Sequence, residues 1–102
     1  MDKLILPGVG AFGEGMRRLL YKGAWIQALN QECLNNCKPL LEICLGMQLL
    51  AHEGTEFGKN RGLDFISGKV EKFHFDENEY RLPHIGWNTV KFKQGNNLYK
   101  GL

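Results

Sequence analysis

One cysteine, placed between two apolar runs, is the strongest candidate for chemistry in this sequence. Residues 41–50 read LEICLGMQLL, so Cys44 follows a short apolar run and precedes a glycine. A nucleophile at the tip of a strand, before a helix, is typical of the nucleophile elbow, usually written G-x-S-x-G, and the helix N-terminus favours a thiolate. Gly46 fits this pattern, whereas Glu42 stands where the leading glycine is expected. The alternative is an ordinary core thiol, because free cysteine is among the most buried residue types.

A glycine-rich stretch near the N-terminus is the second candidate. Residues 8–13 read GVGAFG and match G-x-G-x-x-G, the dinucleotide-binding fingerprint. Pro7, the bulky Phe12 and the lack of an acidic residue about 20 positions later all weaken that match. Two other interpretations rank above it and are equally favoured. One is a simple turn after a strand, and the other is a loop whose backbone N–H groups stabilise a developing oxyanion.

These two motifs need helices and strands to position them, and the pattern of apolar residues predicts that strands and helices alternate along the chain. We expect a strand at 2–7, a glycine loop at 8–15, helical segments at 14–20 and 24–34 that break at Gly23, a strand at 38–44, and a helix at 46–53 that ends near Gly54. Strand, helix, strand, helix is typical of a parallel α/β sheet.

The second half of the chain has a different pattern. Residues 62–75 alternate and carry β-branched and aromatic side chains, 76–79 form an acidic turn, 81–92 indicate further short strands, and 95–102 a last turn or short helix. We therefore expect an antiparallel excursion on the α/β core. Because two parallel strands would leave exposed edges, we also expect the chain to be a fragment, incomplete at both ends.

Bulk composition excludes several classes of protein. The chain has 102 residues, 43% hydrophobic and 24% charged, which suits one small globular domain or a piece of a larger one. A net charge of +2 gives no argument for nucleic acid or a membrane surface as a partner. No apolar run reaches the roughly 18 residues of a spanning helix, and the N-terminus lacks the pattern of a secretory signal. Three cysteines form no disulfide framework, so a reducing cytoplasm is the expected location.

Three segments together carry a family resemblance. LILPGVGAFGEGM, ICLGMQLL and PHIGWN occur in the family's order, from Leu4 to Asn88. They resemble the glutaminase subunits of imidazole glycerol phosphate synthase, which are class I (triad) glutamine amidotransferases. The resemblance implies a flavodoxin-like three-layer core, of which residues 1–102 would be a partial domain. It also implies an enzyme that hydrolyses glutamine and supplies ammonia to a synthase subunit in a heterodimer, without a cofactor or metal.

The resemblance also implies roles for particular residues. Cys44 matches the nucleophile, and the N–H that follows it, on Leu45, resembles one oxyanion donor. The loop of Gly8, Val9 and Gly10 resembles the second donor. Gln48 and Glu56 match positions that hold the amino-acid end of glutamine, which suits Glu56 because a carboxylate pairs with an ammonium group. Trp87 and Asn88 match the face turned toward the synthase.

Two departures from the family pattern qualify these roles. The triad's histidine and glutamate lie beyond residue 102 in the family, and none of His52, His74 and His84 fits that role, so the chain alone should turn over very poorly. Glu42 in place of glycine would crowd the elbow, and would oppose a thiolate if it points inward.

Two rivals to the glutaminase therefore remain: a degenerate amidotransferase-like module that only docks to a partner, and a paralogue that supplies ammonia for surface-sugar amidation. A dinucleotide-binding domain ranks third.

Overall fold

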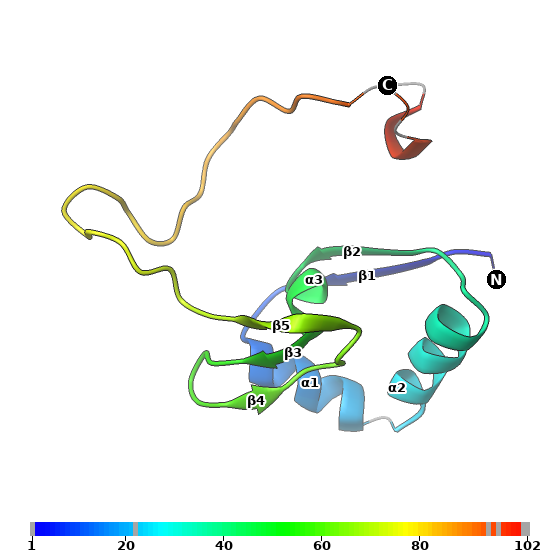
Figure 1. The fold of residues 1–102 in the computed structure, drawn as a ribbon. Helices are drawn as coiled ribbons and strands as arrows, with labels where there is room; N and C mark the ends of the chain where they lie inside the picture. Colours follow the sequence, from blue (N-terminus) through cyan, green and yellow to red (C-terminus); the bar gives the residue numbers. More distant parts are fainter. Residues whose placement is uncertain (1, 22, 94, 96, 101–102) are drawn as a thin grey trace.

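The computed structural model describes residues 2–21, 23–93, 95 and 97–100, which form a small α/β body followed by a long irregular segment (Figure 1). The elements are β1 (Leu4–Gly8), α1 (Phe12–Tyr21), α2 (Ala24–Leu29), the π-helix η1 (Asn30–Asn35), β2 (Leu40–Cys44), α3 (Leu45–Leu49), β3 (Ala51–Gly54), β4 (Asn60–Arg61), β5 (Ile66–Val70) and the 3₁₀ turn η2 (Asn97–Tyr99). The expected α/β class and the helix break at Gly23 are confirmed.

The first sheet is the parallel pair β1–β2, as expected from the two apolar runs. Its register pairs Leu6 with Glu42 and Gly8 with Cys44, so the glycine loop and the cysteine leave the sheet side by side. One face of the pair is half-buried, while Ile5 and Ile43 on the other face are exposed. The carboxyl ends of both strands therefore meet at one edge, which is where α/β proteins place their sites.

The second sheet has the strand order β4–β3–β5. β4 pairs antiparallel with β3, so an antiparallel pair is present, but it lies before residues 62–92, where we expected it. β5, the strand within that range, pairs parallel with β3. The expected helix at 46–53 is wrong in its second half, because α3 ends at Leu49 and residues 51–54 form β3. The cause is non-local: Leu63, Phe65 and their neighbours donate backbone hydrogen bonds to the carbonyls of residues 49–52, so these carbonyls cannot continue a helix.

The expected loop at 8–15 is also shorter than predicted. α1 already begins at Phe12, so Gly13 and Gly15 lie inside this helix rather than in a loop. Both glycines stand where α1 meets its neighbours: a Cβ on Gly15 would lie 3.1 Å from a Leu45 methyl carbon, and one on Gly13 would collide with the Asn60 side chain. The glycines at 13 and 15 therefore serve close helix packing.

The hydrophobic core lies between α1 and α3. Its buried members are Phe12, Met16, Leu45 and Leu49, and Phe12 is fully buried. Two of these four residues belong to the helix that follows Cys44, so the best-packed part of the body lies directly under the candidate elbow.

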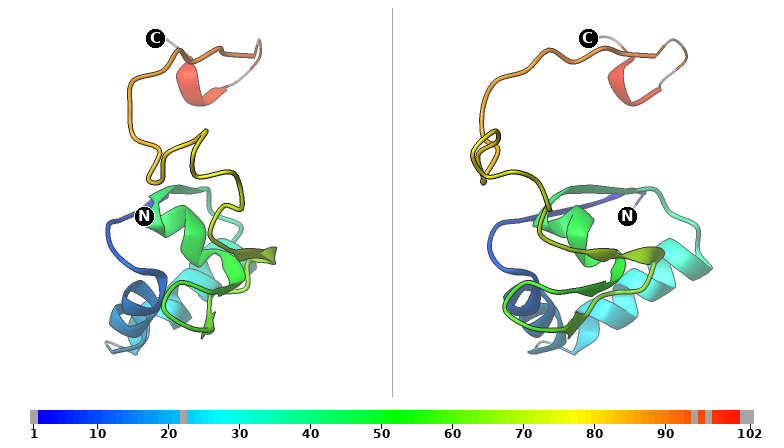
Figure 2. Two further views of the ribbon diagram at one scale, coloured as in Figure 1. Left: turned by 90° about the vertical axis from the view of Figure 1, so that its left-hand side faces the viewer. Right: turned by 60° about the vertical axis from the view of Figure 1, so that its left-hand side comes forward.

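The segment from residue 71 to residue 93 has no regular secondary structure and arches away from the body in all views (Figures 1 and 2). The strands expected at 81–92, and the last part of the one expected at 62–75, are therefore wrong. The acidic turn is confirmed by hydrogen bonds from Glu79 and Tyr80 to the Asp76 carbonyl. The radius of gyration is 15.9 Å, against about 13 Å for a compact chain of this length. Side chains in the arch consequently have little of this chain to pack on.

Candidate active site

Cys44 lies at the tip of a sharp strand-to-helix turn. It is the last residue of β2 and the N-cap of α3, with φ 57° and ψ −117°. A residue with a side chain rarely adopts such a positive φ, and holding it there costs about 1–3 kcal/mol. A strained residue exposed between a strand and a helix is the geometry of a nucleophile elbow. The thiol is exposed, so this arrangement favours the elbow interpretation over the buried core thiol.

Glycine at position 46 is a requirement of this turn. A Cβ on Gly46 would be driven into the carbonyl oxygen of Leu6 on β1, and backbone cannot move aside as a side chain can. Gly8 is tight as well, since its Cβ would stand 3.0 Å from the Cβ of Leu45. Both glycines thus let β1 and the start of α3 approach closely enough to form the turn.

Glu42 does not prevent the elbow from forming. Its side chain is on the half-buried face of β2, where both carboxylate oxygens are buried without a hydrogen-bond partner among the described residues. Burial raises the pKa of Glu42 to about 7. Its charge acts on Cys33 of η1: burial first, and then the nearby Glu42 and Glu32 carboxylates, raise the pKa of that thiol. The elbow therefore forms with glutamate at position 42, on the half-buried face of β2.

The glycine loop runs from Gly8, opposite Cys44, to the first residue of α1. Val9 is almost fully exposed, and Gly10 has φ 121°, a conformation that side chains rarely adopt. A Cβ on Gly10 would meet nothing within 4 Å, so glycine is required there for its torsion and not for space. The loop is therefore open beside the cysteine, with its backbone accessible to a ligand.

The two residues expected to hold glutamine lie on different parts of the fold. Gln48 is half-buried on α3, one turn after Cys44. Glu56 lies in the turn that follows β3, and its Oε2 accepts a hydrogen bond of 3.0 Å from the backbone N–H of Phe12. Glu56 is exposed, and this hydrogen bond connects it to the first residue of α1, at the end of the glycine loop.

Trp87 and Asn88 lie in the irregular arch. The Trp87 side chain is fully exposed, and Ile85 beside it is 85% exposed. The Asn88 side chain accepts a hydrogen bond from the N–H of Thr89. Aromatic and aliphatic side chains in this state are typical of a surface that another protein covers.

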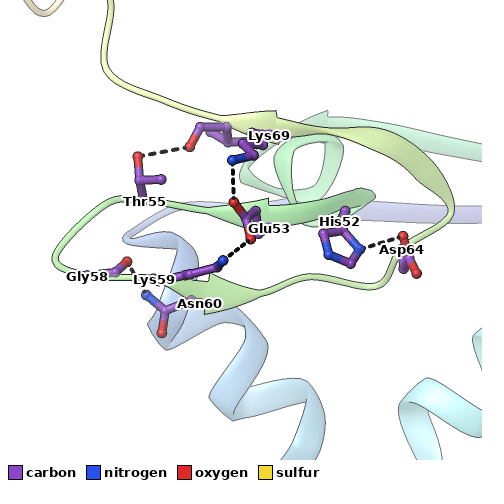
Figure 3. Close-up of polar contacts among 9 residues, drawn as sticks. His52, Glu53, Thr55, Gly58, Lys59, Asn60, Asp64 and Lys69 are labelled. Atoms are coloured by element: carbon purple, nitrogen blue, oxygen red, sulfur yellow. Dashed lines mark hydrogen bonds and ion pairs between the residues drawn. The ribbon is translucent and has the colours of Figure 1, made fainter.

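None of the three histidines is joined to Cys44 by a hydrogen bond within the described part of the chain. His52 lies on β3, not on the predicted helix, and its Nδ1 is 2.9 Å from Asp64 Oδ1 (Figure 3). His52 is therefore hydrogen-bonded locally, to Asp64. His74 and His84 lie in the irregular segment, so the strand expected around His74 is wrong.

Sequence reasoning missed a buried charge on β3, three residues before Glu56. Glu53 of β3 is 5% exposed and pairs with Lys69 of β5 at 2.9 Å and with Lys59 at 3.0 Å (Figure 3). Hydrogen bonds from Lys69 and then Lys59 lower the pKa of Glu53, and Glu53 raises the pKa of Lys69. The group ties β3 to its neighbours just before the turn that carries Glu56. The register of β3 and β5 brings Lys69 to Glu53, and the connection between β3 and β4 brings Lys59 there, so the sequence pattern gives no signal for this group.

The described residues contain no group of three or more histidine, cysteine or acidic side chains arranged to hold a metal ion. A search of the same residues for a helix long and apolar enough to cross a membrane finds none.

Comparison with known proteins identifies the family. Residues 2–102 match the family model Glutamine amidotransferase class-I. The chain is 48% identical to "Imidazole glycerol phosphate synthase subunit HisH 1" of Campylobacter jejuni strain 81-176, over 99% of this chain and 49% of that protein. It is also 48% identical to the HisH subunit of Sulfurimonas denitrificans, over 99% of this chain and 48% of that protein. The HisH 2 subunit of Methanococcus maripaludis is 47% identical over 98% of this chain and 48% of its own length.

The chain spans about half the length of the curated relatives that it matches. Nearly every residue of the chain is covered by the family model. The chain belongs to the class I glutamine amidotransferase family.

Proposed function

We propose that this chain carries the nucleophile site of a glutaminase that supplies ammonia to a synthase subunit. The observation that supports the proposal most strongly is the strained, exposed Cys44 at the tip of β2, beside the open glycine loop. Residues 1–102 are, on this proposal, a partial amidotransferase domain. The relatives' names make imidazole glycerol phosphate synthase, in histidine biosynthesis, the proposed assembly.

In the proposed reaction the Cys44 thiolate attacks the side-chain amide carbon of glutamine. The C–N bond breaks, the nitrogen takes a proton and leaves as ammonia, and a glutamyl thioester remains until water cleaves it to glutamate and the free thiol. The family resemblance implies that the proton carrier is a histidine later in the sequence than residue 102. The N–H of Leu45, at the start of α3, and the loop of Gly8, Val9 and Gly10 would stabilise the negative charge on the oxygen.

Gln48 and Glu56 would hold the amino-acid end of glutamine, with the Glu56 carboxylate pairing with the α-ammonium. No step of this route needs a cofactor, a metal or a nucleic acid. The chemistry is ordinary acyl transfer, in which the thiol, the oxyanion donors and the base carry the reaction.

Active-site labelling tests this proposal. The complete protein, with its synthase partner, is incubated with a diazo-ketone analogue of glutamine, and adducts are mapped by mass spectrometry. We expect an adduct on Cys44 that excess glutamine suppresses, while the exposed Cys37 serves as the internal control for general thiol reactivity. Labelling of Cys37 without labelling of Cys44 would reject the glutaminase.

The second candidate is an interaction module without turnover, and the exposed Trp87 is the observation that favours it. Both candidates place Trp87 and Asn88 against the partner, in a heterodimer. Because buried tryptophans often dominate interfaces, Trp87→Ala should weaken partner binding about 30-fold. Trp25→Ala, on α2, is the matched control and should leave Kd unchanged. If Trp87→Ala and Trp25→Ala bind the partner with equal affinity, Trp87 does not contribute to the interface.

Glu42 leaves one alternative open for the partner. A synthase that amidates a surface sugar would suit a paralogue whose elbow departs from the usual glycine. Co-purification of the complete protein with its synthase, followed by an assay of that synthase's acceptor, separates the two pathways.

A further inference from the structure

The N-terminus of α1 is held from outside the helix, by a segment 44 residues away in the sequence. The backbone N–H of Phe12 donates to Oε2 of Glu56 at 3.0 Å. The first N–H groups of a helix have no partner within the helix, and a carboxylate placed there also interacts favourably with the helix dipole. Glu56 therefore does for α1 what an N-cap side chain does, although it belongs to the turn after β3.

The end of β3, directly before this turn, also holds the Phe12 side chain. A Cβ on Gly54 would lie 2.5 Å from the Phe12 ring, so the ring packs directly on the backbone of Gly54, two residues before Glu56. Phe12 is thereby fixed at two points, its fully buried ring and its N–H group. These two contacts define one end of the glycine loop.

The other end of the loop is fixed by β1, where Gly8 pairs with Cys44. Between the two ends, Val9 is 96% exposed and nothing lies within 4 Å of the position of a Cβ on Gly10. The middle of the loop thus has no packing of its own to hold its peptide groups. Their orientation relative to Cys44 depends on the glycine torsion and on where the two ends are held.

The second oxygen of the Glu56 carboxylate, Oε1, is not used in the contact with Phe12. Among the described residues, none donates a hydrogen bond to its Oε1, whereas Oε2 is occupied by Phe12. A carboxylate can serve two donors at once, one on each oxygen. The arrangement leaves Oε1 available to a cation.

We propose that Glu56 is a positioning residue for the glycine loop: Oε2 holds the loop through the Phe12 N–H, while Oε1 is left for the α-ammonium of glutamine. The inference rests on the proposed function, and adds to it that one side chain serves both the substrate and the oxyanion donors. Donors that are displaced by about 1 Å stabilise a transition state much less well, so this role acts on kcat. A residue that only binds the substrate would act on KM.

The test compares Glu56→Gln with Glu56→Ala in the complete protein with its synthase partner. The amide oxygen of glutamine can still accept from Phe12, whereas its charge is lost. We expect Glu56→Gln to raise KM for glutamine at least tenfold with kcat within about threefold of the parent. Glu56→Ala should raise KM similarly and also lower kcat at least tenfold. Equal kcat values for the two variants would overturn the inference.

A matched control and a second readout keep the test decisive. Glu14→Gln also removes a charge from the first turn of α1 but does not touch Phe12, so kcat should stay unchanged. Amide hydrogen exchange over residues 9–13 should be faster in Glu56→Ala than in Glu56→Gln, whether or not glutamine is hydrolysed. Equal exchange rates in the two variants would contradict the inference that Glu56 anchors the loop. If instead the parent protein neither hydrolyses glutamine nor is labelled at Cys44, the proposed function itself is contradicted.

If Glu56→Ala fails to fold, Glu56→Asp takes its place. The aspartate keeps the charge but is one methylene shorter, so it withdraws the acceptor from Phe12. We expect a lower kcat than in Glu56→Gln, and a kcat equal to that of the parent would contradict the anchor.

Discussion

Replacing Glu42 with glutamine should stabilise the protein above neutral pH and have little effect near pH 4.5. Both carboxylate oxygens of Glu42 are buried without a hydrogen-bond partner among the described residues. Burial of this kind disfavours the charged form and raises the pKa of Glu42 from 4.5 to about 7. Glutamine has nearly the same shape as the protonated glutamate, and it cannot ionise.

The sign and the pH range follow from the direction of this shift. Between pH 4.5 and about 7 the unfolded chain releases the Glu42 proton while the folded protein keeps it, so folding stability falls as pH rises. The loss is complete above the folded pKa. At about 1.4 kcal/mol for each pKa unit, the full shift corresponds to about 3 kcal/mol. Residue 42 is only half-buried, and solvent screening at such a site reduces the expected loss to about 1–2 kcal/mol.

The assay is urea denaturation of the parent and of Glu42→Gln at several pH values from 4.5 to 8. We expect the two free energies of unfolding to agree at pH 4.5 and to separate with rising pH, by about 1–2 kcal/mol at pH 8. Glu79→Gln, at an exposed position, is the control and should follow the parent throughout. A constant difference across the whole range, or a less stable Glu42→Gln at pH 8, would refute the reasoning.

Three further predictions concern the elbow and the buried ion pairs. Gly46→Ala should cost about 3 kcal/mol or more by urea denaturation, because its Cβ meets the Leu6 carbonyl; a loss under about 1 kcal/mol would contradict this contact. Cys44→Gly should be more stable than Cys44→Ala by about 1 kcal/mol in thermal unfolding, because glycine relieves the positive φ; equal stabilities would show an unstrained turn. Glu53→Gln should destabilise the protein at pH 7, and less at pH 3. The Lys69 hydrogen bond lowers the Glu53 pKa, so the stability that the charged Glu53 contributes is lost as pH falls below 4.5; a pH-independent effect would argue against this pairing.

The features that sequence could predict are those that depend on neighbours in the chain. An apolar run that ends at Pro7 predicted β1, a second apolar run at 38–44 predicted β2, and Gly23 predicted the break between α1 and α2. The elbow was predictable too, because the order strand, cysteine, glycine, apolar helix is itself local. Its strained φ and the reason why position 46 must be glycine became clear only with the opposing strand in place.

The features that sequence could not predict depend on partners far along the chain. Residues 46–53 have the spacing of a helix, but β3 forms because residues 62–66 hydrogen-bond with the carbonyls that the helix would have used. Residues 81–92 predict short strands, yet a strand needs a second strand beside it, and the arch has none among the described residues. The contact between Glu56 and Phe12 spans 44 residues and has no local signature.

Two different costs to stability meet at the end of β2. The strain at Cys44 does not depend on pH, and it belongs to the geometry that exposes the thiol at the tip. The cost of burying Glu42 depends on pH and arises on the half-buried face of β2, near Cys33, whose pKa is raised by burial first and then by the Glu42 carboxylate. The first cost is offset by the packing of α3, whose Leu45 and Leu49 lie in the core directly behind the elbow. The second has no compensating contact among the described residues. It is therefore separable from the elbow geometry, which is why a change at residue 42 can alter stability without removing the turn that presents Cys44.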